Sequence, residues 1–392
     1  MRSLCEPIAR RANREDYATG RFWEEGAKQG QNDFKIVLTR FPAPVDSLVA
    51  LLGVRAKVSV DTAEVHSRQM AQHAGSFRAS QVMPSADEEG PLLVATADGT
   101  GVAMRRPRDP RLQQSESQRP GDGEKVQKCQ MAYVGAVYTI DRYIRTPDEI
   151  IEELLHKECA KHRPHPKHKH VWAEMTHPGD GLKQGLLMHA PSYLFAELAV
   201  ECEARDSPHK KELICLLDGE KQFWDLRTEW LVRAVGILDI FHVNVRLWGV
   251  AHCFHREDSP EAKGFVGRYL RMLLEGKVDT VIRSFRQLLA TRRLADEKCK
   301  RLRATITYYN NNRQHMHYDE YLAAGYPIGS GVAEGACGHL VKDRLDGTGM
   351  RWCLDGAPAM LHLRALYLNG DWQDFVEHRI EREQAALYGQ AA

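Results

Sequence analysis

The stretch Leu213-Ile214-Cys215-Leu216-Leu217-Asp218-Gly219 is an uninterrupted apolar run that ends in an aspartate and a glycine. A short run of this kind, closed by a turn signal, is typical of a strand buried on both faces of a sheet. A second stretch, Pro91-Leu92-Leu93-Val94-Ala95-Thr96-Ala97-Asp98-Gly99, has the same form and the same last two residues. The repeated pattern predicts two buried strands of one α/β sheet, each ending in an acid.

The sequence around these two strands supplies further elements. Apolar runs predict strands at 131–140, 170–175 and 235–240, and helices at 193–202, 223–232 and 357–368. From 244 to 320 the sequence is helical in pattern and rich in charge, and Pro327-Ile328-Gly329-Ser330-Gly331 then opens a helix that carries Glu334. This order predicts an RNase-H-like mixed sheet core with a large helical insertion before its last core helix, and a small N-terminal helical segment.

Composition divides the chain into six parts. They are an irregular N-terminal segment at 1–40, a small helical region at 41–85, the first part of the core at 86–243, the helical insertion at 244–322, the last part of the core with the catalytic helix at 323–375, and a tail at 376–392. In the second part, an apolar stretch at 45–52 and a helix starting near Ser59 suit either a small helix-turn-helix or an ordinary helical pair.

The overall composition is that of a soluble globular protein. The 392 residues are 43% hydrophobic and 27% charged, with a net charge of +1. No apolar run has the length of a membrane span, and the N-terminus lacks the apolar core of a signal peptide, which predicts a cytoplasmic protein. The nine cysteines form no CxxC pair, which argues against a zinc ribbon and predicts reduced thiols.

The two strand-ending aspartates predict a metal site. Ligands of α/β proteins bind at the carboxyl ends of the strands, so Asp98 and Asp218 are expected to lie close together there. Carboxylates suit Mg²⁺ or Mn²⁺, and two such ions about 3.5–4 Å apart can serve phosphoryl displacement. With Glu334 as a third acid, the pattern predicts a two-metal catalytic site. The alternatives are that both Asp-Gly pairs are turns and that Glu334 only caps its helix.

Two cationic stretches are candidates for phosphate binding. Residues 283–313 hold nine Lys or Arg against two acids, and clustered cations of this kind are what nucleic-acid binding requires. The stretch around 156–170 is rich in histidine and lysine, and it suits either zinc or, because Pro164 and Pro166 break any helical face, a basic DNA-contact loop; its candidate ligands are His156, Cys159, His162, His165, His168 and His170. Three aromatic residues lie near cations in the sequence and either stack on DNA bases or pack inside the protein: Tyr308, Tyr309 and Trp352.

At this point the sequence resembles a known family. The segment Gly325–Cys337 looks like the third-carboxylate motif of Kra-type insertion-sequence (ISKra) transposases, bacterial relatives of the Mutator-like group. The resemblance extends over roughly residues 45–368 and includes Val341–Leu345, Gly349–Trp352, the first motif at Thr96–Gly99, the second at Leu217–Glu220, and a DxxH motif at Asp239–His242.

The resemblance implies a DDE transposase that cleaves and transfers DNA strands for an insertion sequence. Asp98, Asp218 and Glu334 would be its catalytic, metal-binding triad, with two Mg²⁺ or Mn²⁺ ions. Supporting or DNA-contacting roles would fall to Asp239, His242, Lys342, Arg344, Arg351 and Trp352. His242 is equally well explained as a core histidine bonded to Asp239. The implied partners are element-end and target DNA and further copies of the chain on that DNA, in the nucleoid-associated bacterial cytoplasm.

The sequence also departs from this family. Gly338 replaces an expected basic residue, and Asp346-Gly347-Thr348 replaces a more helical, charged stretch. The family's cysteine-rich N-terminal element is missing and residues 1–35 resemble nothing in it, so a truncated frame is expected. Two alternative functions follow: a catalytically inactive, truncated DNA-binding remnant of a transposase, or another RNase-H-like nuclease.

Overall fold

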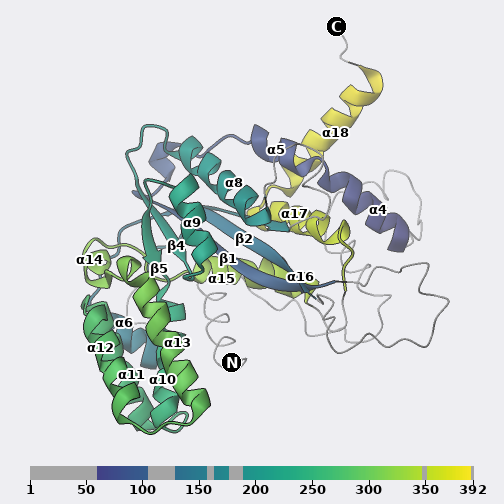
Figure 1. Ribbon diagram of the computed structural model, residues 1–392. Helices are drawn as coiled ribbons and strands as arrows, with labels where there is room; N and C mark the ends of the chain where they lie inside the picture. Colours follow the sequence, from purple (N-terminus) through teal and green to yellow (C-terminus); the bar gives the residue numbers. More distant parts are fainter. Residues whose placement is uncertain (1–59, 105–128, 157–162, 176–188, 347–350, 390–392) are drawn as a thin grey trace, which may run out of the picture.

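The protein is a mixed α/β structure built on one five-stranded sheet (Figure 1). The computed structural model describes residues 60–104, 129–156, 163–175, 189–346 and 351–389. The strands are β1 (Leu92–Ala103), β2 (Cys129–Ile140), β3 (Lys167–Met175), β4 (Glu212–Leu217) and β5 (Val235–Leu238). They lie in the order β3-β2-β1-β4-β5, so the prediction of a mixed sheet is confirmed.

The sheet changes character at β1. The pairs β1–β2 and β2–β3 are antiparallel, whereas β1–β4 and β4–β5 are parallel. Side chains alternate between the two faces along a strand. In β1, Leu93, Ala95 and Ala97 belong to one hydrophobic core, and Leu92 and Val94 belong to another. The sheet therefore separates two cores, which explains why its central strands are apolar throughout.

The first core lies between the sheet and helices from both halves of the chain. It is covered by α8 (Ala190–Arg205), α9 (Lys221–Trp230) and α17 (Gly356–Asn369). The short helices α4 (Val60–Ala71) and α5 (Ala74–Ser80) pack on α17 and on α18 (Trp372–Tyr388), where Phe77 meets Phe375 edge to face at 5.6 Å. The described part of the N-terminal helical region is thus tied to the C-terminal helices. The predicted helix at 45–52 lies outside the described residues.

The second core belongs to a helical bundle that extends from one end of the sheet (Figure 1). It consists of α6 (Pro147–Ile151), α10 (Ile240–Phe254), α11 (Pro260–Leu274), α12 (Val278–Thr291), α13 (Asp296–Asn312) and α14 (Tyr318–Ala323). Local signals start these helices: the Ser259 hydroxyl accepts from the Ala262 amide ahead of α11, and Pro260 fits the first turn. Residues 244–320 are helical in the way their charge pattern predicts.

Three elements differ from their sequence predictions. Strand β1 does not end at Asp98-Gly99 but continues to Ala103, because β2 pairs with it along its whole length. The helix that carries Glu334 is α15 (Gly331–Ala336), followed by a π-helical turn (Cys337–Lys342) and the short α16 (Asp343–Leu345). A π turn changes the angle per residue, so the directions of Lys342 and Arg344 relative to Glu334 do not follow from the 100° step of a regular α-helix. The predicted tail is helical as far as Tyr388.

Strand β5 forms one edge of the sheet, and side chains protect it. The Gly236 carbonyl accepts hydrogen bonds from His315 Nδ1 at 3.2 Å and from the Tyr321 hydroxyl at 3.4 Å. The Tyr318 hydroxyl donates to the Leu238 carbonyl at 2.8 Å. Trp224 stacks on His315 with ring centroids 3.7 Å apart. These hydrogen bonds satisfy the Gly236 and Leu238 carbonyls, which at an unprotected sheet edge could pair with a strand of another chain.

The half-buried His315 makes stability depend on pH. Burial, with a smaller contribution from the charge of Arg227, lowers the pKa of His315 to about 4, below its ordinary value of 6.5. As the pH falls, His315 is protonated in the unfolded chain near pH 6.5 but in the folded protein only near pH 4. Its contribution to the free energy of unfolding is therefore complete above pH 6.5 and is lost as the pH drops towards 4. We expect His315→Gln to flatten the dependence of the urea midpoint on pH across this window. An unchanged slope, equal to that of a control variant at the exposed His66, His66→Gln, would contradict the assignment.

Candidate metal centre

The two strand-associated aspartates lie side by side at the sheet. The last paired residues of β1 and β4 are Ala97 and Leu217, so Asp98 and Asp218 occupy the next position of the same register. By alternation, both continue the series of even-numbered residues that faces the bundle containing α10. Both are half-buried, and the charge of Asp218 acts on Asp98. The register of the parallel strands is therefore what brings the two carboxylates together.

The turn after β4 is held by a tyrosine from the helical insertion. The Tyr308 hydroxyl on α13 donates to the Asp218 carbonyl at 2.5 Å, and Asp218 Oδ1 accepts from the Glu220 amide at 2.9 Å. Gly219 has a φ of +91°, and a Cβ there would lie 2.8 Å from the Tyr308 ring and hydroxyl. Glycine is needed at this position both for its backbone conformation and for space.

Replacing Gly219 by Ala should therefore disturb both stability and the site. The left-handed conformation costs an L-residue about 1–2 kcal/mol, and the contact with Tyr308 adds to this. We expect the free energy of unfolding to fall by about 2–3 kcal/mol in urea titration. Gly264→Ala, where no atom lies within 4 Å of the added Cβ, is the matched control. Equal unfolding midpoints for the two variants would show that the turn is not constrained.

A third aspartate, Asp239, joins the start of α10 to the segment before α15. It is completely buried. Its Oδ1 accepts from the Phe241 amide at 3.0 Å and the Ser330 amide at 3.2 Å. Its Oδ2 accepts from the Ser330 hydroxyl and from His242 Nδ1, both at 2.7 Å. Asp239 therefore fixes where α10 and α15 begin relative to each other.

These ties bring His242 and Glu334 together. Asp239, His242 and Glu334 each offer a ligand atom, and these atoms lie within 4.8 Å of one another, so the three residues can hold a metal ion. Since Nδ1 of His242 is bonded to Asp239, Nε2 is the ring nitrogen left to face a ligand. Asp239 already accepts four hydrogen bonds, which suits an outer role of orienting His242 better than direct coordination.

Asp98, Asp218, Glu334 and His242 share one electrostatic environment. Burial, the charge of Asp239 and that of Asp98 raise the pKa of Glu334 to about 7, while His242 and Lys342 oppose the rise. Burial and Asp218 likewise raise the pKa of Asp98. Burial works against the charged form of His242, but its bond to Asp239 and the charges of Asp239, Asp218 and Glu334 raise its pKa to about 9. The site gathers more negative charge than its own cations balance.

This donor set fits a divalent cation. Carboxylate oxygens suit a hard ion and an imidazole nitrogen suits a transition-metal ion, and either would offset the repulsion that contributes to the raised pKa of Asp98 and of Glu334. Among the described residues, the ligand atoms that lie within 4.8 Å of one another are those of Asp239, His242 and Glu334, and Asp98 and Asp218 do not belong to this group. The two sheet aspartates act on it electrostatically, Asp98 on Glu334 and Asp218 on His242. The structure therefore offers a site with the right chemistry for a metal ion.

The other predicted residues lie around this centre or beyond it. Lys342 acts on Glu334 electrostatically. Trp352 lies at the far end of β1, where its amide donates to the Ala103 carbonyl at 3.0 Å. The guanidinium of Arg344 lies 5.7 Å from the Trp352 ring centroid, and Arg351 is exposed next to it. At about 3.4 Å per residue, Ala103 is about 17 Å along the strand from Asp98, so this cluster is remote from the carboxylates.

Sequence reasoning missed Tyr308 as the anchor of the Asp218 turn, Ser330 as a partner of Asp239, and Cys337, which is hydrogen-bonded to Asp98. The bond from Ser330 had a visible signal, because Ser330 lies in the Gly-Ser-Gly entry to α15. Tyr308 had none, since it depends on where α13 meets the sheet. Tyr309 is fully buried and donates to the Val243 carbonyl at 2.9 Å, so it is a packing residue.

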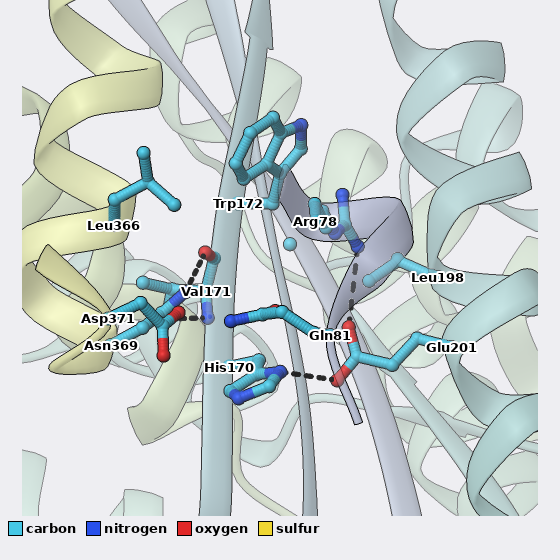
Figure 2. A pocket seen from close by; sticks show the side chains of 11 residues that line it. Arg78, Gln81, His170, Val171, Trp172, Leu198, Glu201, Leu366, Asn369 and Asp371 are labelled. Atoms are coloured by element: carbon cyan, nitrogen blue, oxygen red, sulfur yellow. Dashed lines mark hydrogen bonds and ion pairs between the residues drawn. The ribbon is translucent and has the colours of Figure 1, made fainter. Parts of the chain in front are cut away.

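The described part of the histidine-rich stretch contacts the helices that cover the sheet. His168 and His170 belong to β3, so this part is strand rather than the predicted loop. His170 Nδ1 lies 3.1 Å from Glu201 of α8, which Arg78 also contacts at 3.3 Å (Figure 2). Asn369 bonds both the amide and the carbonyl of Val171. These polar contacts tie β3 to its covering helices; Cys159 and His162 lie outside the described residues.

Comparison with known proteins gives little. No family model and no curated protein matches the chain. Solved structures that match include the Drosophila P element transposase strand transfer complex, at 11% identity over 99% of this chain and 94% of that one, with a TM-score of 0.24. A TM-score this low does not establish a shared fold. In the described residues, no helix is both long enough and apolar enough to cross a membrane.

Proposed function

We propose that this protein is a DDE transposase of the ISKra type, with an RNase-H-like core, that cleaves and transfers DNA strands with Mg²⁺ or Mn²⁺. The observation that carries the proposal is that Asp98 and Asp218 follow adjacent positions of the β1–β4 register and act electrostatically on a group, Asp239, His242 and Glu334, that can hold a metal ion. The element order supports it: three strands, a helix, a strand, a helix, a strand, a helical insertion and a further helix.

The residues have distinct roles in this proposal. Asp98 and Asp218 would hold the metal ions; the charge of Asp98 is affected by Asp218 and in turn acts on Glu334, so Asp98 interacts with both other acids. Glu334 would complete one ligand shell and orient the attacking oxygen. His242, held by Asp239 through Nδ1, would present Nε2 to an ion or to a phosphate oxygen. Lys342 would stabilise negative charge near Glu334.

Bound Mg²⁺ or Mn²⁺ would supply Lewis-acid activation and charge neutralisation. The protein's own contribution is to hold the acids in fixed positions: the sheet register fixes Asp98 and Asp218, and Asp239 fixes the start of α15. Hydrolysis at an element end, and attack of the freed 3′-hydroxyl on target DNA, are both phosphoryl displacements. One site can therefore serve both by exchanging water for the hydroxyl, without a covalent intermediate.

The test is strand cleavage by the full chain on DNA that carries the gene's own genomic flanks. The proposal expects nicks at fixed positions in the flanks with Mg²⁺ or Mn²⁺, and none with EDTA. Cleavage that continues in EDTA would exclude the metal-dependent mechanism. Metal-dependent cleavage spread evenly over flank and unrelated DNA would favour a general RNase-H-like nuclease. Flank binding without cleavage in either metal would favour the inactive remnant.

A further inference from the structure

The metal centre continues into a line of cations along the seam between α10 and α13. We propose that this line, formed by Arg246, Arg301 and Lys298 and named here the α10–α13 track, binds the backbone of one DNA strand leaving the centre. The inference rests on the proposed function, because the centre would hold the phosphate that is cut. The inference adds the path of the DNA to the proposed function: the flanking DNA runs from the centre outward along the helical insertion, away from Trp352.

The α10 side of the track is set by helical spacing. His242, Arg246, Gly249 and Cys253 follow each other at intervals of four, three and four residues, which places them on one face of the helix. His242 belongs to the centre itself. At about 1.5 Å per residue, the distance from His242 to Cys253 is about 16 Å. The face therefore leads directly out of the centre along the bundle.

Side chains from α13 complete the track. The guanidinium of Arg246 lies 3.8 Å from the centroid of the Tyr308 ring. Arg301 crosses α10 at Gly249, where a Cβ would be 3.5 Å from its Cδ. Lys298 Nζ donates to the Cys253 carbonyl at 2.9 Å. The three cations are exposed and are held in order by these contacts, which lowers the entropy lost when they bind phosphates.

The charge pattern favours a polyanion over a small anion. Helix α10 contains no acidic residue, and α13 contains none after Glu297. A duplex strand carries one phosphate per 3.4 Å, so about 16 Å accommodates about five phosphates. From Arg246 to the Lys298 contact at Cys253 the cations extend over about 10 Å of α10, farther than a single phosphate group can reach. The three cations suit a strand of DNA that begins at the centre and follows the seam as far as Lys298, before the acids Glu297 and Asp296 at the start of α13.

The same helix provides a matched control. Arg303 and Lys300 lie two residues beyond Arg301 and Lys298, about 200° around α13, and both are exposed. The double variant Arg301→Gln/Lys298→Gln and the double variant Arg303→Gln/Lys300→Gln therefore remove the same charge from the same helix. Only the first pair changes the track.

The experiment measures binding of the full chain to a labelled 20-base-pair duplex in EDTA, over a range of salt concentrations. The track variant is expected to bind about 10-fold more weakly near 100 mM salt, and the slope of log K against log salt should fall by about 1.8, for two lost phosphate contacts. The control variant should keep the parental slope. Equal losses in both variants, or no binding by the parent, would overturn the track.

This outcome is separable from that of the proposed function because no metal is present in the assay. If the track variant loses affinity selectively but the parent never cuts DNA with Mg²⁺ or Mn²⁺, the track stands and the catalytic proposal fails. If the parent cuts DNA but both variants bind equally well, the catalytic proposal stands and the DNA takes another path. Thermal unfolding of each variant checks that the bundle remains folded.

Discussion

Asp98→Asn will lower metal-dependent strand cleavage by more than about 100-fold while leaving the protein folded. Loss of an outer-shell partner alone costs about 10–100-fold in metal affinity or activity, so loss of a direct ligand should cost more. The amide keeps the shape of the carboxylate, and its oxygen can still accept from the Gly99 amide, as Asp98 Oδ1 does at 2.7 Å. Asp218→Asn should behave in the same way.

The measurement is the rate of cleavage of flank DNA at saturating Mn²⁺, with urea unfolding of each variant alongside. Asp87→Asn, which changes an exposed acid to its amide on the short helical turn before β1, controls for charge alone. If Asp98→Asn cuts DNA as fast as Asp87→Asn, the carboxylate is a turn residue and the two-metal interpretation is wrong. If the variant unfolds much more easily, the comparison moves to Asp218→Asn.

Asp239→Ala should be the most destabilising single substitution at the centre. The side chain is fully buried and accepts four hydrogen bonds, from Phe241, His242 and twice from Ser330. Removing it leaves the amide and hydroxyl of Ser330 buried without their acceptor, and each unmade bond costs about 1–3 kcal/mol. We expect the free energy of unfolding to fall by about 3–5 kcal/mol in urea titration.

The comparison variants separate this effect from general loss of charge. Asp239→Asn keeps one oxygen for the two backbone amides and should cost clearly less than Asp239→Ala. Asp225→Ala removes an exposed carboxylate on α9 and should change stability by less than about 0.5 kcal/mol. A loss for Asp239→Ala no larger than that for Asp225→Ala would show that α10 and α15 are held in place without the Asp239 bonds.

The sequence predicts the sheet better than it predicts the site. The apolar runs at β1 and β4 identify two central strands, because strands covered on both faces need apolar residues throughout. The two Asp-Gly pairs follow neighbouring parallel strands, since the register of β1 and β4 ends at Ala97 and Leu217 and residues 98 and 218 come next. Pairing also explains the main error here: β1 continues past Gly99 because β2 covers it to Ala103, a long-range effect that a local turn signal cannot reveal.

The rest of the centre depends on contacts between distant segments. The sequence predicts Asp239 within a short strand. Its structural role, holding the starts of α10 and α15 together, depends on hydrogen bonds from Ser330, ninety-one residues later. The π turn after α15 contains Gly338, but a single helical glycine does not specify a π turn in the way that Gly370, in the left-handed conformation, marks the end of α17. Tyr308 acts on the Asp218 turn only because α13 returns from the bundle to the sheet.

Binding of Mn²⁺ to the full chain, followed by calorimetry, tests most directly the claim that these carboxylates form a metal centre. The parent should bind one or two ions, and Asp98→Asn and Glu334→Gln should each weaken or abolish that binding, whereas Asp87→Asn should bind as the parent does. Parental binding that is unchanged in both Asp98→Asn and Glu334→Gln, or a parent that binds no Mn²⁺, would contradict the account.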